Sequence, residues 1–244
     1  MTVNFSSLKH MALSPAHYRA ALERPIDPTR AMRIGTATHR LVLGDGPGRR
    51  IVRYDGERRG KAWDAFAAEH ATADILTATE WREAEATARA VQASDAARQL
   101  LDGARYEVPL TWRMAELDCV TGGVDVLGDG YLCDLKTCAS AEPRQLMRDV
   151  VSRQYHAQLA FYRYGARQNG HRVDACYLIC VESSDPHCVV VLRVSDAMLD
   201  AGERSCLLWL ERLRQCQESN EWPGYTQAVL DLEPPPWMVE GDDA

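Results

Sequence analysis

The sequence predicts one α/β domain in which helices flank a central mixed β-sheet. Helical patterning fills the chain to about residue 104. Short runs rich in β-branched and aromatic residues follow, and a tight Gly128-Asp129-Gly130 turn separates two of them. A further helical stretch then divides three expected strands from two later ones. This order of elements predicts a sheet with helices packed on its faces.

The part of the chain before about residue 104 should be mainly helical. Helices are expected over residues 6–22, with an interruption near 14–15, and over residues 29–43, 61–70 and 77–101. Pro25 and Pro28 mark a turn, and Thr29 can cap the second helix. Thr77 and Glu80 fit a capping box at the start of the alanine-rich fourth helix.

Between the second and third helices, the glycines of residues 44–48 should end the helix, and the polar residues 49–60 are expected to form a loop.

Residues 105–219 should hold the sheet. Strands are expected over residues 106–113, 118–126 and 131–137, as an antiparallel meander, and over residues 173–181 and 188–194. A helix is expected over residues 142–168, and Ser195 can start a last helix to about residue 218. The proline-rich, acidic tail of residues 220–244 should pack loosely. The whole chain, 1–244, is interpreted as one domain.

Composition narrows the class of protein. The apolar fraction is 46% and the charged fraction 26%, which is ordinary for a globular enzyme. No apolar run approaches the roughly 20 residues that cross a bilayer, and the first ten residues hold no signal-peptide core. We therefore expect a cytoplasmic protein without a membrane partner. The eight cysteines form no C-x-x-C pair and are interpreted as small buried hydrophobes.

Positive charge is carried almost entirely by arginine. The net charge is −7, and of 28 basic residues only Lys9, Lys61 and Lys136 are lysines. Basic residues form two clusters in the sequence. Each cluster is either a solvated part of the surface or a contact for nucleic acid, and both interpretations stay open. They comprise Arg49, Arg50, Arg53, Arg58, Arg59 and Lys61, and then Arg144, Arg148, Arg153, Arg163, Arg167 and Arg172. A lysine inside an apolar strand, as Lys136 is, calls for a chemical reason.

The expected hairpin around Gly128-Asp129-Gly130 brings Asp125 beside Asp134 and Lys136. Residues two apart in a strand share a face, so Asp134 and Lys136 should lie together, with Leu135 directed into the core. Carboxylates are natural ligands for Mg²⁺, and an ammonium can orient water or neutralise charge during phosphodiester hydrolysis. A simple salt bridge at the strand end is the alternative.

Asp125, Asp134 and Lys136 match the PD-(D/E)xK motif, with valine in place of the proline before Asp125. The chain resembles the RecE-type exonucleases and their RecB-like and lambda-exonuclease-like relatives, which implies a restriction-endonuclease-like core. The resemblance runs from about residue 6 to 225 through four segments in the family's order. These are Ser14-Pro15-Ala16-His17-Tyr18, Met32-Arg33-Ile34-Gly35-Thr36-Ala37-Thr38-His39, Gln154-Tyr155-His156-Ala157-Gln158-Leu159-Ala160-Phe161-Tyr162 and Trp222-Pro223-Gly224-Tyr225.

The resemblance implies metal ligands beyond the hairpin. His39 would bind or orient the metal, although a histidine on an apolar helix is often a core residue. Glu107, on the strand before Asp125, would hold a second metal or a metal-bound water, or is a plain exposed glutamate. Leu135 would offer its backbone carbonyl to the metal, together with Asp125 and Asp134.

Other residues would act on the substrate. Gln154, Gln158 and Tyr162 have i, i+4, i+8 spacing and form one helical stripe that could contact a DNA phosphate or brace Lys136. Alternatively, Tyr162 is core and the glutamines are solvated. Arg33 could bind a terminal 5′ phosphate through its guanidinium.

The activity implied by the resemblance is Mg²⁺-dependent digestion of linear double-stranded DNA from its ends, 5′ to 3′, with Mn²⁺ as a substitute. Relatives often form homo-oligomeric rings and work with a single-strand annealing protein in recombination or repair. Two alternatives stay open: a PD-(D/E)xK endonuclease, and a non-catalytic DNA-binding or assembly module. An iron–sulfur nuclease is disfavoured because no cysteine precedes Cys119.

Overall fold

The computed structural model describes residues 2–24, 27–44, 46 and 50–234. The elements are α1 Phe5–Leu8, the 3₁₀ helix η1 Lys9–Ala12, α2 Pro15–Glu23, α3 Arg30–Leu43, β1 Ile51–Tyr54, α4 Gly60–Glu69, β2 Asp74–Thr77, α5 Ala78–Ala93, α6 Asp95–Leu101, β3 Arg105–Met114, β4 Leu117–Gly128, β5 Gly130–Cys138, α7 Pro143–Ser152, α8 Tyr155–Gln168, β6 Val173–Glu182, β7 Val189–Val194 and α9 Asp196–Ser219.

A five-stranded sheet in the order β3-β4-β5-β6-β7 forms the centre of the fold. The strands β3, β4 and β5 are antiparallel neighbours, β5 and β6 run parallel, and β7 is antiparallel to β6. Helices α7 and α8 connect the parallel pair, as a parallel connection requires. The predicted mixed α/β fold and its antiparallel meander are confirmed.

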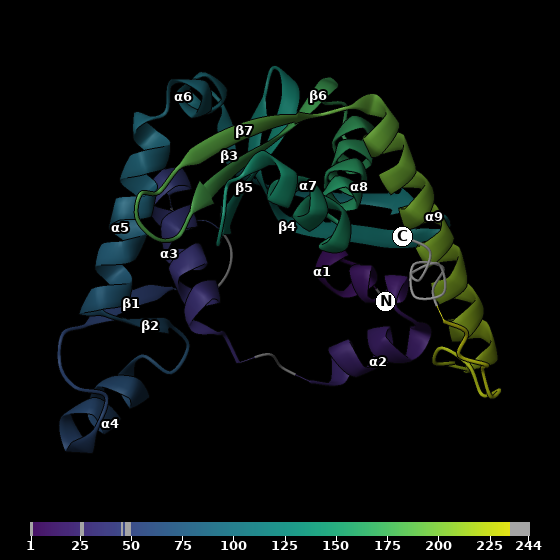
Figure 1. Ribbon diagram of the computed structural model, residues 1–244, viewed down its shortest axis with the longest axis horizontal. Helices are drawn as coiled ribbons and strands as arrows, with labels where there is room; N and C mark the ends of the chain where they lie inside the picture. Colours follow the sequence, from purple (N-terminus) through teal and green to yellow (C-terminus); the bar gives the residue numbers. More distant parts are fainter. Residues whose placement is uncertain (1, 25–26, 45, 47–49, 235–244) are drawn as a thin grey trace, which may run out of the picture.

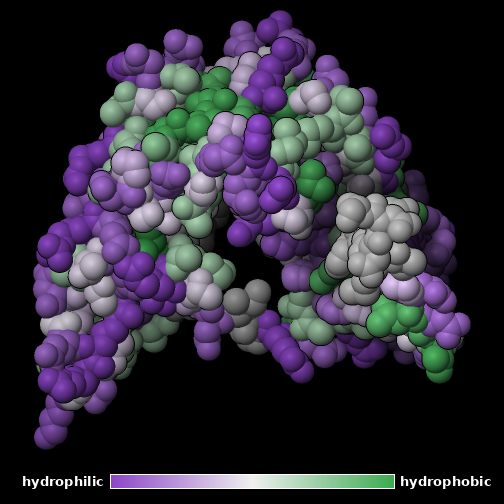
Figure 2. Space-filling view, in the orientation of Figure 1, coloured by the Kyte–Doolittle hydropathy of each residue, from purple (hydrophilic) through white to green (hydrophobic). Residues whose placement is uncertain are grey.

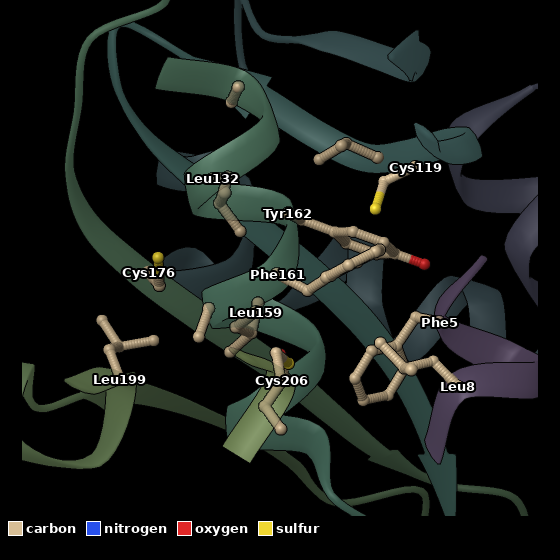
Figure 3. Close-up of a cluster of buried hydrophobic side chains, with 14 of the residues drawn as sticks. Phe5, Leu8, Cys119, Leu132, Leu159, Phe161, Tyr162, Cys176, Leu199 and Cys206 are labelled. Atoms are coloured by element: carbon tan, nitrogen blue, oxygen red, sulfur yellow. The ribbon is translucent and has the colours of Figure 1, made fainter. Parts of the chain in front are cut away.

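Each face of the sheet is covered by helices from a different part of the chain. On one face, Leu43 of α3 and Val91 of α5 pack with Leu135 and Ile179 of the sheet. The other face packs against α8, α9 and the N-terminal segment, and its cluster includes Leu132 and Leu178. Figure 3 shows Leu159 and Phe161 of α8 among Phe5, Leu8 and Cys206 in this larger core.

The molecule has the outline of an arch (Figure 1). The sheet lies across the top, α3 and α5 with β1, β2 and α4 form one limb, and α9 with the N-terminal helices forms the other. Figure 2 shows a hollow between the two limbs. In the part of the chain that the structure describes, no helix combines the length and apolar character that crossing a bilayer requires.

The first helical segment is interrupted at Ser14, as predicted, and two others are divided where one helix was expected. The first is divided into α1, η1 and α2, with Ser14 capping α2 through the His17 amide. Ser94 ends α5 and accepts a hydrogen bond from Ala97 N–H, so that α6 begins anew. Between α7 and α8, Gln154 has a φ of 62°, in the left-handed region that interrupts a helix.

The prediction of a loop over residues 49–60 is wrong in part, because Ile51–Tyr54 forms the strand β1. This strand pairs in parallel with β2 in a separate two-stranded sheet, and α4 connects the two. Sequence patterning missed β1 because it has four residues and no buried position. The expected turn at Pro25, residues 47–49 and the tail beyond residue 234 lie outside the described residues.

The start of the tail packs more closely than the prediction of a loose tail suggests. Trp222 stacks on Tyr18 with ring centroids 6.1 Å apart, and Ala16 N–H donates to the Pro223 carbonyl at 3.1 Å. Further along, Leu230 and Leu232 are exposed. The segment from Trp222 to Tyr225 therefore anchors the start of the tail on α2, and the described residues after it are exposed up to residue 234.

A buried glutamate of α5, Glu80, connects this helix to α3 through hydrogen bonds. Glu80 and Thr77 form the predicted capping box of α5, with Thr77 N–H donating to Glu80 Oε2 at 2.8 Å. Arg33 of α3 and Arg58 also donate to the Glu80 carboxylate, at 2.7 and 3.0 Å. Burial opposes ionisation of this carboxyl, but the hydrogen bonds from Thr77 and Arg33 lower its pKa.

We expect Glu80→Gln to destabilise the protein by about 2 kcal/mol at pH 7, because it removes a buried charge that accepts three hydrogen bonds. Since the folded-state pKa is lowered, this contribution is present above the ordinary value of 4.5 and is lost as the pH falls through the folded-state pKa. Denaturant unfolding at pH 7 and pH 4 measures both effects. The control is Glu83→Gln on the same helix, where the pair with Arg30 is more exposed. Equal losses in both variants would contradict the network.

Candidate active site

The predicted catalytic residues gather where β4 and β5 diverge. The ladder between these strands pairs Val126 with Cys133 and extends from there only towards the turn. Beyond this pair, Asp125 bends back and its Oδ2 accepts a hydrogen bond of 2.8 Å from the Leu135 amide. The carboxylate of Asp125 therefore takes the place of a strand partner beside Asp134, and the hairpin spacing read from the sequence does bring the two acids together.

Asp134 and Lys136 share the sheet face that carries α8, while Leu135 packs in the core of the opposite face. Lys136 Nζ lies 2.5 Å from Asp134 Oδ2, and the Asp134 side chain is 3% exposed. Burial raises the pKa of Asp134 to about 6, in opposition to the adjacent Lys136 ammonium. Burial alone would lower the pKa of Lys136, but the charges of Asp134 and Asp125 raise it. Near neutral pH the two residues form a charged pair.

Helix α3 brings His39 to the site. His39 Nδ1 lies 3.6 Å from Asp125 Oδ2. One turn earlier, Gly35 faces β5 so closely that an added Cβ would lie 3.0 Å from the Thr137 hydroxyl. This close approach explains the glycine of the histidine segment, because a side chain at position 35 would push α3 and His39 away from the strand.

Glu107 reaches the site through an irregularity in β3. Glu107 lies opposite Asp125 with a φ of 50°, and the register of the β3–β4 ladder shifts just after it, between Val108 and Leu110. Gly123 of β4 makes room for it, since a Cβ there would meet Glu107 Oε2 at 2.5 Å. Burial and the charge of Asp125 raise the pKa of Glu107, while His39 has the opposite effect. Sequence patterning could place Glu107 on the strand but not turn it inwards.

Three of these side chains can bind one cation together. Ligand atoms of His39, Glu107 and Asp125 all lie within 4.8 Å of one another. Two ligands on opposite sides of Mg²⁺ would be roughly 4.2 Å apart at its usual ligand distance. The span and the two carboxylates therefore fit a divalent metal. Leu135 directs its N–H towards Asp125, and the N–H and C=O of a strand residue face the same neighbour, so its carbonyl is compatible with the same site.

Tyr155 is a neighbour of the lysine that sequence reasoning did not single out. Lys136 Nζ lies 4.8 Å from the centre of the Tyr155 ring, a cation–π distance. The signal was present, because Tyr155 follows Gln154 in the third family-like segment. The ring therefore forms one wall of the space around the ammonium.

The glutamine and tyrosine stripe is only partly continuous. Gln158 donates to the Tyr162 hydroxyl at 3.3 Å, whereas Gln154 precedes the first turn of α8 and lines a pocket with Tyr155. Tyr162 is 8% exposed and belongs to the large core. Burial raises its pKa, and the charge of Asp134 acts in the same direction, so the phenol is near the acidic site. Its proposed role in catalysis stays a prediction.

Arg33 lies in a different pocket from these residues. Its guanidinium donates to Glu80 and to the Pro28 carbonyl, each at 2.7 Å. The pocket beside it is lined by Arg58, Trp63 and residues of β2. The structure therefore does not bring Arg33 to the acidic cluster, and its predicted contact with a terminal phosphate stays a prediction.

A mixed sheet that carries two aspartates and a lysine on a diverging hairpin defines a PDDEXK-like protein. Residues 4–230 match the family described as a PDDEXK-like domain of unknown function, DUF3799, and the chain belongs to that family. Among curated proteins, none matches the sequence significantly.

Solved structures support the fold. A proposed exonuclease from Eubacterium rectale is 14% identical with a TM-score of 0.69, and the match covers 98% of this chain and 93% of that one. A phage-related exonuclease from Haemophilus somnus 129PT is 12% identical with a TM-score of 0.42, over 91% and 97% of the two chains. LHK-Exo, in complex with dAMP, is 16% identical with a TM-score of 0.32, over 78% of this chain and 96% of that one. The first of these shows that the fold is shared.

We expect Glu107→Gln to raise the melting temperature of the metal-free protein at pH 8. The Glu107 pKa is raised by burial and by Asp125, so the cost of its charge grows as the pH rises through the folded-state pKa. The gain should be on the order of a few degrees and should vanish as the pH falls below 4.5, where the carboxyl is protonated in both the folded and the unfolded state. Thermal melts across this pH range measure it.

The same variant should gain less stability from added Mg²⁺ or Mn²⁺ than the wild type, because one ligand has lost its charge. Glu116→Gln, at an exposed turn, is the control. If Glu107→Gln has a lower melting temperature than the wild type at pH 8, the charge of Glu107 does not destabilise the metal-free site and the prediction is wrong.

Proposed function

We propose that the chain is a metal-dependent nuclease that hydrolyses phosphodiester bonds of DNA. The observation that carries this proposal is the convergence of the ligand atoms of His39, Glu107 and Asp125 beside the Asp134–Lys136 pair. Membership of a PDDEXK-like family gives the same class of chemistry. A salt bridge at a strand end requires only its two charged partners. It does not explain why an imidazole and two further carboxylates converge beside it.

The cation that we propose is Mg²⁺, with Mn²⁺ able to substitute, held by His39, Asp125, Asp134 and the Leu135 carbonyl, with Glu107 as an additional acid. When bound, it supplies charge stabilisation at the phosphate and a more acidic water. Carboxylate ligands suit both ions.

The chain's own residues provide orientation and proton handling. The Leu135 amide fixes the Asp125 carboxylate, and Tyr155 and Asp134 fix the Lys136 ammonium. A held ammonium can orient the attacking water and neutralise charge that develops on the phosphate. The neighbouring carboxylates raise its pKa, so it is a cation and a hydrogen-bond donor at neutral pH. Gln158 and Tyr162 would brace this region from α8.

We extend the proposal to an exonuclease that digests linear duplex DNA from its ends, 5′ to 3′, in recombination or repair. The named solved structures are described as exonucleases, and the segments quoted above resemble RecE-type enzymes. A homo-oligomeric ring and a single-strand annealing partner belong to the same proposal.

The deciding experiment compares end-labelled linear duplex with closed circular duplex, first with Mg²⁺ and then with EDTA. We expect digestion of the linear DNA alone, and only with metal. Rapid nicking of closed circles would favour an endonuclease instead, and no cleavage of either substrate with any divalent metal would favour a non-catalytic module.

Lys136→Ala should lower the rate of cleavage by at least about a hundredfold, because it removes the only ammonium beside the described carboxylates of the site. Circular dichroism should show a folded protein. Lys61→Ala, on α4 away from the site, is the matched control and should cleave at the wild-type rate. A Lys136→Ala protein that retains full activity would refute the mechanism.

A further inference from the structure

A basic pocket lies next to the lysine of the candidate active site. It is lined by Lys9 and His10 of η1, by Ala12 and Leu13, and by Ser152, Arg153, Gln154 and Tyr155 at the α7–α8 junction. Its volume is about 370 Å³, within the roughly 300–1,000 Å³ range of ligand pockets. The segments that form it adjoin α1 and α7 in Figure 1.

The pocket shares a wall with the active site. Tyr155 lines it, and the same ring lies 4.8 Å from Lys136 Nζ. Lys9 is near enough to Lys136 and Arg153 for their charges to contribute, after desolvation, to a lowered pKa of its ammonium. Three cationic side chains from separate elements therefore surround one region.

Lys136 is paired with Asp134, but little negative charge balances the basic side chains that line the pocket itself. Within the described residues, no carboxylate forms an ion pair with Lys9 or His10, and Arg153 has only a long contact of 3.9 Å with Asp149. By contrast, Arg163 contacts three acids and Arg214 two. Lys9 and Arg153 are both exposed, so their charges are accessible to an anion that enters the pocket.

We propose that this pocket binds a phosphate group of the nucleic acid, through Lys9 and Arg153, beside the bond that the metal site would cleave. The inference rests on the proposed function for the identity of the ligand. Lysine supplies a compact charge and arginine a fork of donors, and phosphate accepts from both. The pocket is better placed for this task than Arg33, whose guanidinium is already bound to Glu80.

The phosphate has two sources with the same chemistry: a monoester at a DNA end, or a diester within the strand. A monoester carries more charge, so a preference for phosphorylated ends would indicate the first source. Equal binding of phosphorylated and unphosphorylated ends would indicate the second.

The test measures binding in EDTA, so that no cleavage is needed. Short duplexes with a fluorescent label and either a 5′-phosphate, a 3′-phosphate or hydroxyl ends are titrated by anisotropy. We expect Lys9→Ala and Arg153→Gln each to weaken binding about tenfold, and Lys9→Arg to retain it. The slope of log Kd against log salt should fall by about 0.9 for each contact removed, because one counterion fewer is released.

The chain provides a matched control in Lys61→Ala, since lysine occurs at only three positions. Loss confined to phosphorylated ends, or shared by all duplexes, supports the pocket and identifies the source. Wild-type affinity of Lys9→Ala for every duplex, or an equal loss in Lys61→Ala, would overturn the inference. Phosphate binding without any cleavage would instead sink the proposed nuclease activity and leave the pocket in place.

Discussion

The buried Asp134–Lys136 pair is the constraint around which the rest of the site is arranged. A carboxylate that is 3% exposed is costly unless a cation and hydrogen-bond donors compensate for its charge. Three neighbouring elements contribute to the environment of this pair. Strand β5 places the pair, Tyr155 of α8 covers the ammonium, and the divergence of β4 lets Asp125 approach without a ladder partner. The β4–β5 ladder is thus paired next to the turn and open beside the residues where chemistry is expected.

Much of this arrangement could be predicted from the sequence, because it depends on local rules. Alternation in a strand places Asp134 and Lys136 on one face, and a glycine turn brings Asp125 alongside. Thr29 and Thr77 cap their helices as expected. Sequence patterning therefore predicted the five strands of the main sheet, its mixed character and the hairpin that carries three of the site residues.

Long-range packing decided what the sequence could not predict. The inward orientation of Glu107 depends on its positive φ and on the space beside Gly123. Neither feature can be predicted from a sequence pattern. The ion pair that holds Arg33 joins residues 47 positions apart, and Lys9 approaches Lys136 only because η1 packs beside the α7–α8 junction. Strand β1 was missed because it pairs with a strand on the far side of a helix.

The cluster of His39, Glu107 and Asp125 draws on both parts of the chain. The imidazole comes from α3, in the helical part before residue 104, and the carboxylates come from the sheet. A cation bound by all three would act as a cross-link between layers that are otherwise joined by apolar packing. A bound metal would then stiffen the fold as well as serve the chemistry. It would resist any motion that separates the limb containing α3 from the five-stranded sheet.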